Sequence, residues 1–155
     1  MRLNFICDKH RTYFNQQPEI AVQSWAHNCE IAEGLYEQGR WQEALPYVGS
    51  AYETAEILLV NDICMSVNPI EWFLHSLEGL TETLKKLGQI DDCLEFYHAA
   101  ADRLRKHKRQ SRDMKVTIDI EIARIDGLRK SLSEGLPATA KIYQFKLNAE
   151  SMVLH

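Results

Sequence analysis

The fold is decided by the stretch GRWQEALPYVGSA, residues 39–51, because its pattern returns in GQIDDCLEFYHAA, residues 88–100. Each copy reads glycine, polar, large apolar, polar, acidic, small residue, then leucine, with an alanine six residues after that leucine. Glycine is the usual residue just past a helix end, because it adopts positive φ without strain. Each copy therefore predicts a helix end, a tight turn and the start of a second helix, and two copies predict a repeated helical hairpin.

Apolar residues recur at helical spacing on both sides of each copy. The pattern predicts helices over residues 19–38 and 41–60 around the first copy, and over 69–87 and 90–108 around the second. In the first of these helices we expect Ala26 to lie on the inward face. The inward face of 41–60 is predicted to comprise Trp41, Ala44, Leu45, Val48, Ala51, Tyr52, Ala55, Leu58 and Leu59.

Residues 113–133 fit two periods. Ile118, Ile120 and Ile122 alternate with polar residues as in a strand, whereas Met114, Ile118 and Ile122 also share one face of a helix. We expect a helix, since a lone strand could not satisfy its backbone hydrogen bonds. With a last helix over 138–153, the prediction is a single all-α domain over 1–155 with about six helices. Its expected parts are an N-terminal arm or cap over 1–18, hairpins over 19–62 and 67–109, and a degenerate hairpin over 112–153.

This arrangement resembles the tetratricopeptide (TPR) repeat, in which a small residue five positions after the glycine lets two helices approach closely. Ala44 and Cys93, which occupy this small-residue position in the two copies, are 49 residues apart, whereas a regular TPR repeat is 34 residues long. The resemblance therefore implies a TPR-like array with longer repeats. A closed helical bundle is the alternative. The matching pairs are Gly39 with Ala44, Gly88 with Cys93 and, more loosely, Gly135 with Ala140.

The resemblance also implies a function. In TPR proteins the first helices of the hairpins line a concave face that binds a peptide or helix of another protein. We therefore expect a non-enzymatic adaptor, regulator or chaperone-like module, and its acidic positions favour a basic partner. Carried onto this sequence, the expected partner-binding residues are Glu33, Tyr36, Glu37, His75, Glu78, Glu82, Lys85, Lys86 and Arg129. Cys29, Ile122 and Ile125 occupy similar positions, and at least two of them are expected to be core.

Motifs of catalysis are absent from the sequence. It has no glycine-rich phosphate loop, no nucleophile elbow and no His-Glu-x-x-His, so we expect neither an enzyme nor a cofactor. Zinc-type ligands occur at Cys7, His10, His27 and Cys29. Residues two apart on a helix point about 200° apart, so His27 and Cys29 would converge poorly on one ion. We expect core or surface roles for all four and no metal.

Charge is distributed unevenly. Residues 19–62 carry eight acidic side chains and one basic one, whereas residues 103–115 carry seven basic and one acidic. A solvated helix end is the expected role of the basic run. The alternative function is a regulator associated with nucleic acid through residues 103–115. A self-associating structural module, such as a homodimer, is the third, because a short array exposes its end helices.

Length and composition are those of a globular protein: 155 residues, 45% hydrophobic and 26% charged, with net charge −4. No run of 18 apolar residues is present, so no membrane span is expected. Asp8 and Lys9 interrupt the apolar start, which argues against a secretory leader. With four scattered cysteines, we expect reduced thiols and a cytoplasmic protein.

Overall fold

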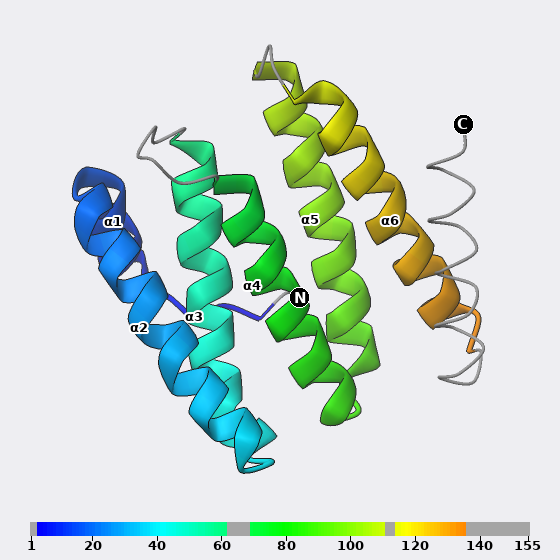
Figure 1. The fold of residues 1–155 in the computed structure, drawn as a ribbon, viewed down its shortest axis with the longest axis horizontal. Helices are drawn as coiled ribbons and strands as arrows, with labels where there is room; N and C mark the ends of the chain where they lie inside the picture. The colour runs from blue at the N-terminus through cyan, green and yellow to red at the C-terminus, as the bar shows by residue number, and fades with distance from the viewer. Residues whose placement is uncertain (1–2, 62–68, 111–113, 136–155) are drawn as a thin grey trace. The chain divides into compact units, whose positions relative to one another are not determined.

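The computed structural model describes residues 3–61, 69–110 and 114–135, and within these ranges it contains six helices and no strand (Figure 1). The all-α class predicted from the sequence is confirmed. The predicted helix over 138–153 lies outside the described residues. The helices are α1 (Asp8–Gln16), α2 (Pro18–Glu37), α3 (Trp41–Val60), α4 (Pro69–Lys86), α5 (Ile90–Gln110) and α6 (Lys115–Ser133).

The chain divides into two compact units between Gln89 and Ile90. The first unit contains α1 to α4, and α3 packs against α1, α2 and α4. The second contains α5 and α6, which pack against each other. The predicted hairpin over 67–109 crosses the boundary between the units, so the packing of α4 against α5 stays a prediction.

The repeated glycines end their helices in the same way. Gly39 and Gly88 have φ of +67° and +73°, in the left-handed region. The N–H that follows each glycine donates back to a carbonyl five residues earlier, from Arg40 to Leu35 and from Gln89 to Leu84, both at 2.9 Å. This bond satisfies a carbonyl that the helix end would otherwise leave unpaired. The helix end and tight turn predicted at each copy are confirmed.

Residues 115–133 form a helix, as predicted, but two expectations about faces are wrong. Met114 has φ of +73° and is exposed. A left-handed residue cannot continue a right-handed helix, so α6 begins one residue later, at Lys115. Ala26 is exposed as well. It lies five residues after the buried Ala21, which is about 140° around the helix, so it faces away from α3.

Helix α3 is the centre of the first unit. It lies between α2 and α4, and nine consecutive residues, 51–59, are buried (Figure 1). A helix buried on every side has no solvated face, so even polar side chains such as Glu53 and Thr54 are enclosed. Of the predicted inward face of 41–60, every member is buried except Trp41, which is half-buried.

The segment before α1 is an extended arm that packs on α3. One oxygen of the buried Glu53 carboxylate accepts the backbone N–H groups of Phe5, at 2.9 Å, and Ile6, at 2.6 Å. The other oxygen lies 3.4 Å from the Arg11 guanidinium on α1. Ile6 packs against the cluster of Phe14, Ala21, Ile57 and Leu58. The arm and α1 together therefore supply the partners that a buried carboxylate needs. We call this set of contacts the Glu53 clasp.

Gly49 allows the arm to approach α3 closely. The Phe5 ring lies so near Gly49 that a Cβ built there would overlap ring atoms. Glycine costs about 0.5–1 kcal/mol in a helix interior relative to alanine. At this position the loss is offset by room for an aromatic ring.

We expect Gly49→Ala to lower the free energy of unfolding by about 1–3 kcal/mol, because the added methyl group overpacks against Phe5. Gly34→Ala is the matched control, since a Cβ there meets nothing within 4 Å and should stabilise the helix by about 0.5–1 kcal/mol. Urea unfolding of both variants measures the difference. In a Phe5→Ala background, Gly49→Ala should cease to destabilise; a penalty that persists there would show that the arm is not its cause.

We expect Glu53→Gln to lower the free energy of unfolding by about 2–4 kcal/mol, because two charge-assisted bonds weaken and Arg11 loses its partner. Urea unfolding measures the loss, and amide hydrogen exchange at Phe5 and Ile6 should accelerate. Glu43→Gln, which breaks the exposed pair with Arg40, is the control and should cost less than about 1 kcal/mol. Equal costs for the two variants would contradict the clasp.

Candidate binding pocket

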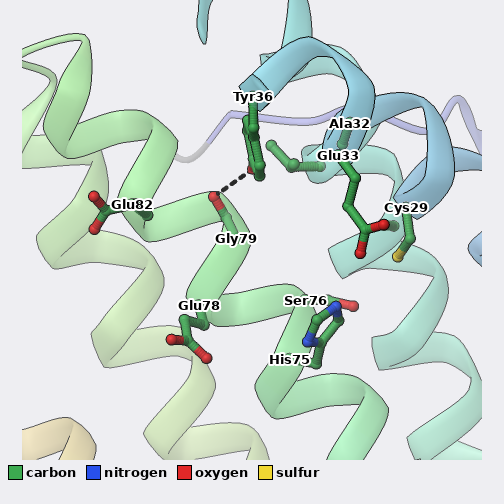
Figure 2. A pocket seen from close by; sticks show the side chains of 11 residues that line it. Cys29, Ala32, Glu33, Tyr36, His75, Ser76, Glu78, Gly79 and Glu82 are labelled. Atoms are coloured by element: carbon green, nitrogen blue, oxygen red, sulfur yellow. Dashed lines mark hydrogen bonds between the residues drawn. The ribbon is translucent and has the colours of Figure 1, made fainter. Parts of the chain in front are cut away.

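Two side-chain links join α2 to α4 across α3. The Trp25 indole N–H donates to the Ser76 hydroxyl at 2.6 Å, and the Trp25 ring stacks on Trp72 with centroids 4.2 Å apart. Further along α2, the Tyr36 hydroxyl donates to the Gly79 carbonyl at 2.9 Å (Figure 2). It also lies 2.7 Å from the Thr83 hydroxyl. These links set the separation of α2 and α4.

A pocket of about 310 Å³ lies between the two helices. Its floor is made by small or apolar residues, and these leave space that larger side chains would fill. The linked tyrosine stands at one side, Glu33 lies on the α2 side, and the carboxylates of Glu78 and Glu82 lie on α4 and point away from α2 (Figure 2). The lining residues are Cys29, Ala32, Glu33 and Tyr36 from α2, Val48 and Ala51 from α3, and His75, Ser76, Glu78, Gly79 and Glu82 from α4.

The two walls carry negative charge. Glu33 lies on the α2 side, and Glu78 and Glu82 lie on the α4 side (Figure 2). All three are exposed, and none forms an ion pair with a residue that the structure describes. Both helices therefore contribute glutamates to the lining of a pocket whose floor is less polar.

The other two titratable residues that α2 contributes to the pocket, Cys29 and Tyr36, are neutral near pH 7. Burial raises the pKa of the Cys29 thiol from 9.0 to about 11, and the nearby Glu33 carboxylate contributes to the rise. Burial likewise raises the pKa of Tyr36, although its hydrogen bond with Thr83 acts in the opposite direction. Cys29 therefore remains a thiol, which is a poor nucleophile and a poor metal ligand.

Five of the nine predicted partner-binding residues line this pocket: Glu33, Tyr36, His75, Glu78 and Glu82. They come together because helical spacing places each set on one face of α2 or α4. Glu37, Lys85 and Lys86 do not line it, and the Lys86 ammonium lies 5.7 Å from the centroid of the Trp41 ring. Arg129 belongs to the second unit, where it lies 3.8 Å from Asp126.

The floor was not predicted. Ala32, Val48 and Ala51 follow the ordinary pattern of inward-facing residues, and no sequence signal separates a pocket floor from a filled core. Gly79 did carry a signal. A glycine inside a strongly amphipathic helix costs stability and so points to a place where space or a close approach matters. A Cβ at Gly79 would lie 3.4 Å from the Tyr36 hydroxyl and 3.8 Å from Val48, in ordinary contact.

Ion pairs within the second unit occupy part of the basic run 103–115. Arg105 pairs with Asp126 at 2.7 Å and Asp102 at 3.2 Å, and Lys108 pairs with Asp119 at 2.6 Å. A hollow of about 430 Å³ beside these pairs is lined by Arg105, Lys108, Arg109, Lys115, Asp119 and Ile122. The α6 carboxylates thus offset two cations of the run.

The four zinc-type ligands are found in different settings. The Cys7 thiol lies 3.0 Å from Nδ1 of His10 at the start of α1, whereas Cys29 lines the pocket. Among the residues described, no three His, Cys, Asp or Glu side chains gather as a metal site. In the same part of the chain, none of the helices combines the length and apolarity needed to cross a bilayer.

The pKa of Cys29 predicts how stability depends on pH. The thiol pKa is higher in the folded chain than in the unfolded chain, so its contribution is complete only well below pH 9 and is lost as pH rises toward about 11. The stability difference between wild type and Cys29→Ala should therefore shrink between pH 8 and 10.5, as measured by urea unfolding. Alkylation at pH 8, followed by mass spectrometry, should modify the exposed Cys7 faster than Cys29. If the stability difference between wild type and Cys29→Ala stayed constant between pH 8 and 10.5, the raised pKa of Cys29 would be contradicted.

Comparison with known proteins leaves the pocket to be interpreted from its own chemistry. No protein-family model matches the chain, and no curated protein or solved structure is significantly similar to it.

Proposed function

We propose that the chain is a non-enzymatic protein-interaction module that binds a peptide or helix of another protein in the pocket between α2 and α4. The observation that carries this proposal is a pocket of about 310 Å³ whose walls are held by the Trp25–Ser76 and Tyr36–Gly79 hydrogen bonds. Binding sites are commonly preformed, with apolar linings and a few placed polar groups, and range over about 300–1,000 Å³. A volume at the low end suits one anchor side chain.

The apolar floor and the polar groups of the pocket would play different roles in recognition. Ala32, Val48 and Ala51 offer apolar surface to an anchor, which would gain affinity by leaving water. The serine and tyrosine hydroxyls that line the pocket are engaged in links between helices, so their orientation is fixed before a ligand arrives. Preorganisation of this kind lowers the entropic cost of binding.

Support for a binding role over a catalytic one comes from the state of the pocket's side chains. With a pKa of about 11, the Cys29 thiol is not an activated nucleophile. The TPR-like resemblance adds to this support, because Glu33 and Glu82 belong to the helices that precede Gly39 and Gly88. The alternative of nucleic-acid binding through residues 103–115 is weakened, since Arg105 and Lys108 are engaged in ion pairs.

Selection from a displayed random peptide library on the full chain tests the proposal. We expect specific peptides to be recovered and to bind Gly79→Leu at least tenfold more weakly than wild type, because the leucine side chain fills the pocket. Gly34→Leu is the control, since a side chain there meets open space, and it should bind within twofold of wild type.

Thermal unfolding of both leucine variants distinguishes a filled pocket from a lost fold. The gentler Gly79→Ala, whose methyl group makes only ordinary contacts, should reduce affinity by a smaller factor without loss of stability. Peptides that bind the Gly79 variants as tightly as wild type would place binding elsewhere and contradict the proposal.

A further inference from the structure

Resting on the proposed function, we infer that the pocket's partner is a basic segment in which one apolar anchor residue has Lys or Arg on both sides. The inference comes from three glutamates that line one pocket. Glu33 stands on the α2 side, whereas the carboxylates of Glu78 and Glu82 lie on α4 and point away from α2 (Figure 2). A segment anchored on the floor and crossing both helices would therefore pass Glu33 over α2 and Glu78 and Glu82 over α4.

These carboxylates are available to a partner. Each is exposed, and each lacks an ion pair with any described residue. By contrast, Glu43 and Glu53 in α3 are paired with Arg40 and Arg11. The pocket thus gathers carboxylates that have no ion pair among the residues the structure describes.

The sequence of the first unit carries few basic side chains beside these carboxylates. Residues 1–89 carry twelve acidic and six basic side chains, a net charge of −6. Two of the six, Arg11 and Arg40, are engaged by carboxylates on α3, and Lys86 lies over the Trp41 ring. Negative potential over the first unit would attract a basic segment and repel an acidic peptide or a nucleic acid.

The buried anchor and the carboxylates contribute differently to binding at this site. Ion pairs at an exposed opening are screened by salt and contribute little each, whereas burial of the anchor supplies most of the affinity. The carboxylates instead discriminate between partners, because a like charge placed beside them is unfavourable. Both Cys29 and Tyr36 stay neutral near pH 7, so neither adds charge to that of the three glutamates.

The test compares two triple variants in the same peptide selection at about 50 mM salt. Glu33→Gln, Glu78→Gln, Glu82→Gln removes the carboxylates of the opening. Glu19→Gln, Glu30→Gln, Glu71→Gln is the matched control, because it removes the same charge from exposed positions of α2 and α4 that do not line the pocket.

Wild type should select peptides with an apolar residue flanked on both sides, within about four positions, by Lys or Arg. The pocket triple variant should bind these peptides at least tenfold more weakly and should lose the enrichment of basic residues. The control triple variant should stay within about threefold of wild type. Raising the salt to about 500 mM should reduce the difference in peptide affinity between the two triple variants, because salt screens the attraction between the carboxylates and the basic peptide.

Three results would overturn the inference. They are recovery of wild-type binders without basic flanks, equal binding by the pocket triple variant and wild type, and complete displacement of the peptide by spermidine at the peptide's own concentration. The last result would identify a free amine as the ligand. In the first two cases, loss of peptide binding in the Gly79→Leu variant would show that the pocket still binds a peptide. The proposed function would then stand, and only the inference of a basic partner would be rejected.

Discussion

The first unit depends on one constraint, the complete burial of the middle of α3. Nine consecutive residues there are buried, so the polar groups among them that water does not reach need a partner within the protein. Glu53 is the most demanding of these, because a buried carboxylate without partners is strongly unfavourable. The backbone of the arm and the guanidinium of Arg11 meet that demand. The N-terminal arm, predicted from the sequence only as an arm or cap, therefore packs against the core and supplies two of the bonds to Glu53.

The same helix has a second role on its other side. Gly49 and Glu53 receive the arm, whereas Val48 and Ala51 form part of the pocket floor. Both sets fall within two turns of α3, and both rely on residues that are small or unusually polar for a central helix. Support for the arm and space for a ligand thus come from one short piece of sequence.

Local features could be predicted from the sequence, and features that depend on contacts between distant segments could not. Gly39 and Gly88 end helices through bonds within six residues, so their pattern sufficed. Helical spacing likewise brought Glu33, Tyr36 and Glu82 to one pocket. The floor depends on which faces of three helices meet, which spacing alone does not fix. Glu53 reads as an ordinary surface charge until the arm is placed, and Met114 departs from its pattern because its backbone is left-handed.

The Glu53 clasp also bears on the order in which the first unit assembles. It joins residues 48 apart in sequence, so its bonds cannot form until α3 has been made. During synthesis the arm leaves the ribosome before α3, and its docking site is complete only some fifty residues later. The arm can therefore dock only after α3 has been made, and the Glu53 carboxylate requires solvent until the arm does so.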